Sequence, residues 1–423
     1  MAHRRHRQGI ERRSEAVPSA IVALSAFDRL LIAPLLTSIA RGLAVSIGAV
    51  SLVATVHFIS YGLAQVGHGW LSDRIGRVRS LRLALLGVTL GNTIAAAAPS
   101  LGVLIGARAV VGAASGGLVP GALVLLADEN AGASRARKQA ALIAALGGGT
   151  ALTAVVGLAG NTNGWRAIFA LTATVSLLLI PLLGPNRPPP EQRPRHRALR
   201  TLRRPEVRFV SLIAVPEGAA VFGFVVFFAP ALQSLGSSLA VAALGTGTVG
   251  LGMVVGGIVV RRLTGRVADA HLLLAGASLL TAGYLLAADM ALAPILAAAA
   301  LAGIGQAALH STLQRWATEA APDARGLSTA LFATGAFGGA GLAALTGALL
   351  PEHFLALFIA GAASACAAGM IALRYRVGGD RPSSAQEAAR PSIDATAARN
   401  HGSRSAATSP HIRCRSIDCP RPR

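Results

Sequence analysis

Twelve long apolar stretches, separated by short polar connections, limit what this chain can fold into. About 20 apolar residues suffice for an α-helix to cross a bilayer, and inside the bilayer only helices and closed barrels satisfy their backbone hydrogen bonds. Of the 423 residues, 53% are hydrophobic and 13% are charged. We therefore expect an all-α membrane protein. The predicted spans are 18–40, 44–68, 79–98, 101–126, 138–159, 165–184, 209–231, 239–261, 270–288, 291–312, 325–349 and 353–374.

Lysine and arginine are distributed unevenly between the two sides that the alternating spans define. Of the 39 basic residues, 35 lie in or beside the connections and tails of one side. Arg41 and Arg166 lie on the opposite side, and Arg29 and Arg108 lie inside spans. Cytoplasmic loops of membrane proteins carry such an excess of positive charge. We expect a multi-pass protein of the inner (plasma) membrane with both termini in the cytoplasm.

A basic, proline-rich connection divides the spans into two groups of six. Residues 185–208 hold eight arginines and predict a solvated cytoplasmic linker. The other expected regions are a basic tail over 1–17, bundles over 18–184 and 209–375, and a disordered polar tail over 376–423 that can rest on anionic membrane lipid. Because no folded basic domain presents the net charge of +21, nucleic acid is not an expected partner.

The two groups of spans are weak copies of each other. A shift of 188 residues carries Gly69 onto Gly257. The same shift carries Asp28, in the first span, onto the neighbour of Glu217 in the seventh. We expect two degenerate repeats, with carboxyl groups at symmetry-related depths as the candidate coupling site.

Carboxyl groups inside a span need a reason to be there. An ionisable side chain at the centre of a span costs roughly 2.5–3.5 kcal/mol, so it usually faces a partner, water or substrate. A carboxyl group can bind a proton or a cation, but it binds both at once only poorly. This competition gives a simple route to antiport. Asp28 could instead compensate Arg29, although adjacent side chains of a helix point about 100° apart. Glu217 follows Pro216, where a helix can bend and expose carbonyl groups to a cavity.

The loop between the second and third spans carries the most specific motif. The segment from Gly67 to Arg79, GHGWLSDRIGRVR, has the pattern G-x-L-S-D-R-x-G-R, whereas a positive loop needs only the arginines. This pattern closely resembles the corresponding loop of major facilitator superfamily (MFS) transporters. Its members here are Gly69, Leu71, Asp73, Arg74, Gly76 and Arg77.

The resemblance implies the MFS fold, in which twelve transmembrane helices form two pseudo-symmetric six-helix bundles. The bundles would rock around a central site lined by spans one, four, seven and ten, giving alternating access. The loop motif would act as a conformational latch that holds the cytoplasmic ends together in the outward-facing state. Its glycines would let helix ends approach and turn tightly.

Further polar residues inside the spans are candidates for the transport site. One of them belongs to a pattern that resembles the drug:proton antiporter branch of this superfamily, and the others have two possible roles. Arg108 and Gly112 resemble an R-x-x-x-G pattern of proton-driven members, in which the arginine faces the cavity and is linked to proton transfer; alternatively, Arg108 pairs with an acid to hold helices together. His57, His310 and Gln306 can relay protons or bind substrate, or can be satisfied by interhelical hydrogen bonds.

Span five departs from the drug antiporter pattern. Those transporters usually carry G-x-x-x-G-P-x-x-G-G there, and this chain has Thr153 and Ala154 where Gly-Pro is expected. Gly149 and Gly157 keep the outer glycine positions. Small residues at this spacing still allow close helix packing, so the expected fold is unchanged.

The expected function is proton-coupled efflux of a small amphiphilic or cationic compound, with Asp28 and Glu217 as acceptors and Arg108 modulating them. The first alternative is proton-linked uptake or export of an anionic metabolite that contacts Arg29 and Arg108. A minor alternative is a non-transporting membrane sensor. The sequence has no metal-binding or nucleophile motif of a membrane enzyme, so neither an enzyme nor a cofactor or metal is expected. The expected partners are the substrate, protons and lipid, and the protein is expected to be a monomer.

Overall fold

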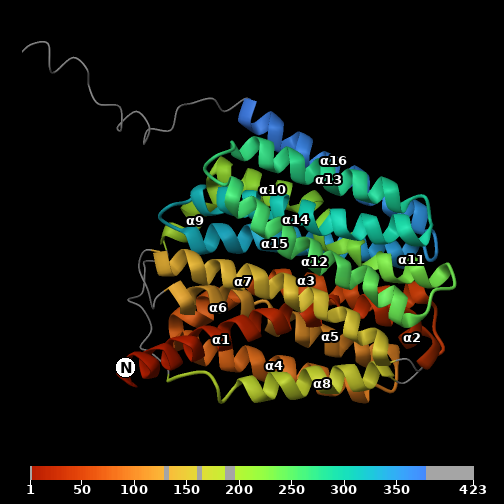
Figure 1. Ribbon diagram of the computed structural model, residues 1–423, viewed down its shortest axis with the longest axis horizontal. Coiled ribbons are helices and arrows are strands. Elements are labelled where there is room, and N and C mark those ends of the chain that lie inside the picture. Colours follow the sequence, from red (N-terminus) through yellow and green to blue (C-terminus); the bar gives the residue numbers. More distant parts are fainter. Residues whose placement is uncertain (1, 128–132, 160–163, 186–195, 378–423) are drawn as a thin grey trace, which may run out of the picture. The chain divides into compact units, whose positions relative to one another are not determined.

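The computed structural model describes residues 2–127, 133–159, 164–185 and 196–377, and these ranges are almost entirely helical and contain no strand (Figure 1). Within them, nine helices are long and apolar enough to cross a membrane, and the bent pair α1 and α2 makes a tenth. The other two predicted spans correspond to shorter apolar helices, Ala144–Val156 and Gly164–Leu179. The prediction of an all-α membrane protein is confirmed.

The first half of the chain extends to the end of α8. Its elements are α1 (Ala2–Leu30), α2 (Ile32–Gly42), α3 (Ile47–Ile75), α4 (Arg77–Ala97), α5 (Leu101–Ser115), α6 (Leu118–Ala127), α7 (Ala133–Ala151), the 3₁₀ helix η1 (Leu152–Ala159) and α8 (Gly164–Leu179). The segment 1–17, predicted as a tail, is helical from residue 2 because it continues α1.

The second half begins with a short helix in the predicted linker. Its elements are α9 (His196–Arg203), α10 (Pro205–Gly218), the π-helical turn η2 (Ala219–Gly223), the 3₁₀ helix η3 (Phe224–Phe227), α11 (Phe228–Ser234), α12 (Leu239–Leu263), α13 (Asp269–Ala287), α14 (Leu292–Glu319), α15 (Arg325–Leu349) and α16 (Phe354–Val377). The connection predicted as a linker over 185–208 thus contains α9 and the start of α10. Nearly all of the polar tail predicted over 376–423 lies outside the described residues.

The first and seventh spans are irregular near prolines. α1 and α2 meet at an angle of 45° beside Leu31, because Pro34 lacks an N–H and its ring clashes with the carbonyl of Leu30. In the seventh span the α-helix gives way to a π turn two residues after Pro216–Glu217 and to a 3₁₀ turn before α11. The helix is therefore irregular after Pro216, and the irregularity is a change of helix type.

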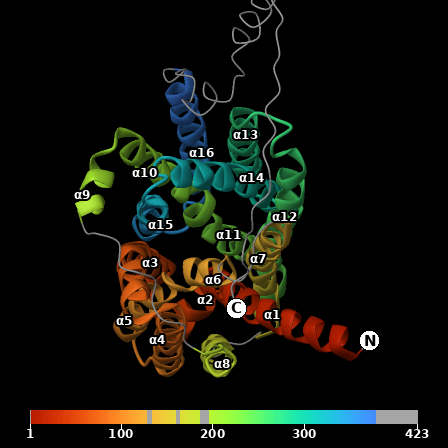
Figure 2. The ribbon, with the colours of Figure 1, turned by 90° about the vertical axis from the view of Figure 1, so that its left-hand side faces the viewer.

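The two halves touch in three regions. α3 packs along α15, α7 and η1 pack against α12, and α2 packs against α11 (Figure 2). Glycine makes the second contact close, since a Cβ on Gly250 would lie 2.2 Å from the backbone nitrogen of Ala151. In the first contact, the hydroxyl of Thr334 donates to the carbonyl of Gly62 at 2.8 Å.

The turns that follow the second and eighth spans each contain a glycine with positive φ. Gly76, between α3 and α4, has φ 89°, and Gly265, between α12 and α13, has φ 81°. These φ values are favourable only for glycine. A positive-φ glycine thus recurs at corresponding places in the two halves, although the second connection is longer.

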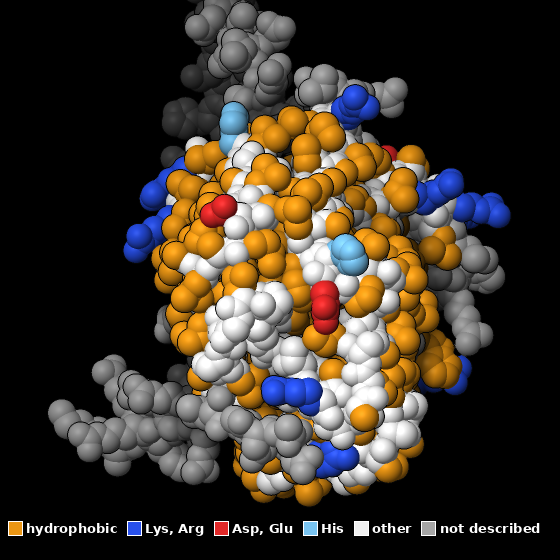
Figure 3. All heavy atoms as spheres, turned by 90° about the vertical axis from the view of Figure 1, so that its right-hand side faces the viewer, with side chains coloured by type: hydrophobic (Ala, Val, Ile, Leu, Met, Phe, Trp, Pro, Cys, Tyr) orange, Lys and Arg blue, Asp and Glu red, His pale blue; other side chains and the backbone are white. Residues whose placement is uncertain are grey.

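Apolar side chains cover much of the outer surface. Leu63, Leu212 and Leu349 are among the large apolar residues with more than half of their surface exposed. Figure 3 shows the end of the molecule near α2 and α11, where hydrophobic and uncharged side chains predominate. Such a surface is suited to lipid and would be unfavourable in water.

Candidate functional site

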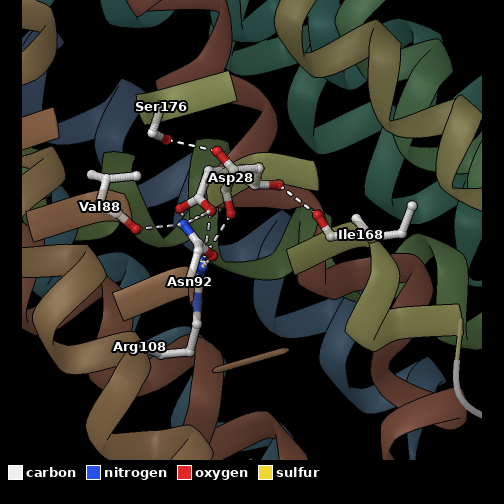
Figure 4. Close-up of polar contacts among 7 residues, drawn as sticks. Asp28, Val88, Asn92, Arg108, Ile168 and Ser176 are labelled. Carbon is white, nitrogen blue, oxygen red and sulfur yellow. Dashed lines mark hydrogen bonds and ion pairs between the residues drawn. The ribbon is translucent and has the colours of Figure 1, made fainter. Parts of the chain in front are cut away.

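The first polar cluster joins three helices of the first half and contains Asp28 of α1, Asn92 of α4 and Arg108 of α5 (Figure 4). Nη1 of Arg108 donates to both carboxylate oxygens of Asp28, at 3.1 and 3.2 Å, and Nη2 donates to the Asp28 backbone carbonyl at 2.8 Å. Nδ2 of Asn92 donates to Oδ1 of Asp28 at 3.0 Å. The side chains of Asp28 and Arg108 are each only 1% exposed, so this ion pair is sealed from solvent.

Close helix packing places Arg108 in this cluster. A Cβ on Gly112 would lie 2.3 Å from the carbonyl oxygen of His57, so only glycine lets α5 cross α3 there. This contact gives a physical reason for the R-x-x-x-G spacing. The guanidinium of Arg108 also lies 5.5 Å from the ring centre of Phe169 in α8, within the range of a cation–π contact.

The second polar cluster lies in the other half and contains Glu217 of α10 and His310 of α14. Nδ1 of His310 and Oε1 of Glu217 are 2.7 Å apart. Oε2 of Glu217 has no hydrogen-bond partner among the residues the structure describes. Glu217 is fully buried, whereas the side chain of His310 is 25% exposed. Solvent can therefore reach the imidazole but not the carboxyl group.

The two clusters lie on corresponding spans of the two halves but differ in access. Each pairs an acid on the first span of its half with a basic side chain on the fourth: Asp28 with Arg108, and Glu217 with His310. The first pair is closed on all sides, and its base stays charged in proteins. The second has a histidine in place of the arginine, and the histidine side chain is 25% exposed.

Arg29 points away from Asp28 and toward the second half. Its guanidinium carbon lies 4.9 Å from the ring centre of Phe222 and 5.5 Å from that of Phe337. Its Nε has no hydrogen-bond partner among the described residues. Compensation of Arg29 by Asp28 is therefore excluded in this structure, and Arg29 instead connects the two halves.

His57 and Gln306 lie in buried positions with unused hydrogen-bonding capacity. Neither ring nitrogen of His57 has a partner in the described part of the chain, and neither has Oε1 of Gln306. Both residues leave polar atoms that water or a substrate could use.

Sequence reasoning missed Asn92 and the aromatic residues around Arg29. Asn92 is a lone amide within a predicted span, and the cost argument used for Asp28 also applies to it. Phe222, Phe337 and Tyr61 gave no such signal, because apolar rings are expected in any membrane helix. Only the packing of the halves brings these rings together.

The loop motif surrounds the turn between α3 and α4. Asp73 and Arg74 are exposed, and the guanidinium of Arg74 lies 4.2 Å from the ring centre of Trp70. Gly76 forms the turn with positive φ, as expected for a tight turn. Gly69 lies inside α3, and a Cβ there would meet nothing within 4 Å, so the close approach expected at Gly69 does not occur in this structure.

The small residues of span five support close packing on two sides. A Cβ on Gly149 would lie 2.1 Å from the carbonyl oxygen of Ala23 in α1. On the other side, the Cβ of Ala154 faces Gly247 of α12. The predicted close packing is confirmed despite the missing Gly-Pro.

The chain is similar to known transporters in sequence and fold. The model of the Major Facilitator Superfamily matches residues 19–231 and 210–414. A triacylglyceride transporter of Mycolicibacterium hassiacum is 30% identical over 177 residues, which cover 40% of this chain and 32% of the relative. The multidrug efflux pump LfrA of Mycolicibacterium smegmatis is 33% identical over 181 residues, 42% of this chain and 36% of the pump. The aligned part thus spans about a third of these curated relatives.

A solved structure supports the fold at low sequence identity. The xylose transporter XylE from E. coli, in a partially occluded inward open conformation, superposes with a TM-score of 0.70 and 14% identity. The superposition covers 86% of this chain and 97% of XylE. At this identity the likeness concerns the fold alone.

Proposed function

Because this chain belongs to the Major Facilitator Superfamily, we propose that it is a proton-coupled transporter that exports small amphiphilic or cationic compounds by alternating access. The family establishes that the chain is a membrane transporter and not an enzyme. Proton coupling, direction and substrate class are the parts that we propose.

The Glu217–His310 pair is the observation that carries the proposal of proton coupling. A buried carboxyl group with one free oxygen touches an imidazole that solvent can reach. Histidine exchanges protons near neutral pH, so it can pass a proton between water and Glu217. When a cation approaches, an ionised Glu217 is favoured and the proton leaves through His310.

Asp28 has a different role in this proposal. Arg108 holds both of its oxygens, and Asn92 donates to one of them. A proton on Asp28 would have to replace these charge-assisted bonds, each typically stronger than a neutral hydrogen bond. The Asp28–Arg108 pair therefore acts as a fixed link between α1 and α5, and Glu217 acts as the proton acceptor.

Alternating access would use the contacts between the halves. We propose that the bundles 18–184 and 209–375 rock as units about the central clusters. At the end near α2, Nε2 of Gln233 in α11 donates to the carbonyl of Pro34 at 3.1 Å, and Gln233 also accepts from Thr37. Near the other end of α3, glycines 67 and 69 have open space around them. This arrangement fits a molecule closed near α2 and open near Gly67 and Gly69, and the loop motif would latch in the opposite state.

The proposed substrate class follows from the relatives and the site together. One relative is named as a multidrug efflux pump and another as a triacylglyceride transporter. Triacylglycerides are apolar molecules, so an amphiphilic substrate agrees with both names. The aromatic rings next to His310 would contact the apolar part of such a compound.

One observation favours the alternative of an anionic metabolite. Arg29 is 4% exposed and forms no ion pair with a carboxylate in the described ranges. An arginine without an acid partner can bind an anion. Arg108 does not help this alternative, because Asp28 already neutralises it.

The test is transport of ethidium into liposomes that contain the purified protein, with the interior made acidic relative to the medium. We expect protons leaving the liposomes to drive ethidium uptake. Glu217→Gln should reduce the uptake to the level of protein-free liposomes, because the replacement cannot bind and release a proton.

Asp269→Asn is the matched control. Asp269 is also an acid paired with a base, Arg315 at 2.7 Å, but its side chain is 27% exposed at the start of α13. This variant should transport like the parent. Uptake by Glu217→Gln at the parent rate, or movement of an organic anion together with protons in place of ethidium exchange, would contradict the proposal.

A further inference from the structure

Aromatic rings from both halves meet around Phe337 of α15, in what we call the interface aromatic cluster: Tyr61, Phe222 and Phe337. Phe222 and Phe337 are stacked, with ring centres 4.9 Å apart and an interplanar angle of 15°. The ring of Tyr61, from α3 of the first half, lies 4.1 Å from that of Phe337. The cluster therefore contains side chains from both halves.

A cation already lies on this cluster, and it is part of the protein. The guanidinium of Arg29 is 4.9 Å from the centre of Phe222 and 5.5 Å from that of Phe337. The faces of aromatic rings attract cations, most strongly where water is excluded. Arg29 is 4% exposed, and its Nε has no hydrogen-bond partner among the described residues.

Arg29 lacks the partner that usually keeps a buried arginine in place. Its neighbour Asp28 is held by Arg108, and no carboxylate in the described ranges pairs with it. Buried charges inside a membrane are normally paired or face a substrate path. The contact with Phe222 and Phe337 is thus the main interaction that holds the guanidinium, and another cation could replace it.

We propose that Arg29 is an internal cation that competes with a cationic substrate for the interface aromatic cluster. This inference rests on the proposed export of cationic compounds and adds a determinant of specificity to it. An organic cation with apolar groups is less strongly hydrated than a compact ammonium ion and covers more of the rings. Small, well-hydrated cations would not displace Arg29, so the competition selects bulky amphiphilic cations.

The position of Phe222 connects this competition to the proton site. The ring of Phe222 lies 5.1 Å from that of His310, edge to face. The guanidinium of Arg29 lies over the same Phe222 ring. A substrate cation on the cluster would therefore lie next to the Glu217–His310 pair. Displacement of Arg29 and release of the proton would follow from the same binding event.

The test compares two probes of nearly equal shape and opposite charge, tetraphenylphosphonium and tetraphenylborate, by equilibrium binding to the full-length protein in detergent. Removing the internal competitor in Arg29→Gln should raise the affinity for the phosphonium roughly five- to thirty-fold, the value of one desolvated cation–π contact. The affinity for the borate should not rise. Phe222→Leu should lower the affinity for the phosphonium.

Two control variants separate competition from a general change in the protein. Arg29→Lys keeps a cation at the position and should bind the phosphonium nearly as the parent does. Phe358→Leu removes a ring from a different stack, 5.5 Å from Phe228, and should leave binding unchanged. Thermal unfolding of each variant checks that it is folded.

The outcomes distinguish this inference from the proposed function. An unchanged or lower phosphonium affinity in Arg29→Gln overturns the competition, even if the parent still exchanges cations for protons. A loss of borate affinity in Arg29→Gln with no gain for the phosphonium would assign Arg29 to an anion site instead. If the parent transports no cation in the liposome assay, the proposed export of cations fails independently of these binding results.

Discussion

Removal of Arg108 should destabilise the protein strongly, and removal of Asp28 at the same time should restore part of the loss. In Arg108→Met the carboxyl group of Asp28 stays buried but loses the guanidinium contacts at 3.1 and 3.2 Å, and the Asp28 backbone carbonyl loses its bond at 2.8 Å. Only the bond from Asn92 at 3.0 Å then remains. Breaking one partner of a buried ion pair costs about 3–5 kcal/mol.

The double variant Asp28→Asn with Arg108→Met should be more stable than the single variant. Without the acid no uncompensated charge is left in the interior. Replacement of a whole buried ion pair often changes the stability of a protein little. Thermal unfolding in detergent is the assay. At roughly 2 °C per kcal/mol, the lower end of the range for larger domains, Arg108→Met should melt 6–10 °C below the parent.

The comparison of the two variants can refute the reasoning. If the double variant melts below Arg108→Met, the losses are additive and the pair does not behave as a buried ion pair. A fall of less than about 2 °C in Arg108→Met would have the same meaning, because it corresponds to a solvent-exposed contact.

Four other substitutions test the packing and the contacts between the halves. Gly339→Ala should lower the melting temperature, since the added Cβ would lie 1.9 Å from the carbonyl oxygen of Val215. The control is Gly338→Ala, whose Cβ would meet nothing within 4 Å, so this variant should be as stable as the parent or slightly more stable. Gly76→Ala should cost about 1–2 kcal/mol in thermal or chemical unfolding, because φ is 89° at this turn. Gln233→Leu removes two hydrogen bonds between α11 and α2 and should speed amide hydrogen exchange in both helices; unchanged exchange would show that these bonds do not hold the halves together.

The sequence predicts the helices well because the bilayer leaves few alternatives. The span 325–349 coincides with α15, and most other boundaries differ by a few residues. The errors arise where the hydropathy argument has no information. Helix propensity continues α1 into the basic segment before it, and α9 forms within a connection that composition alone marks as a linker.

The candidate site was predictable in its members but not in its pairings. The cost of burying charge identifies Asp28, Arg108 and Glu217, and the repeat relates the two acids. Nothing in the sequence shows that Arg108 closes the first cluster while His310 leaves the second open to solvent. That difference depends on how α5 and α14 pack, which the spacing of residues along one helix does not determine.

The most direct test of the central claim is the proton count when tetraphenylphosphonium is added to the purified protein in a weakly buffered detergent solution. The account predicts that the parent and Asp28→Asn release protons, and that Glu217→Gln and His310→Gln release none or far fewer. Release by Glu217→Gln equal to that of the parent, or its loss in a folded Asp28→Asn, would contradict the assignment of proton exchange to the Glu217–His310 pair.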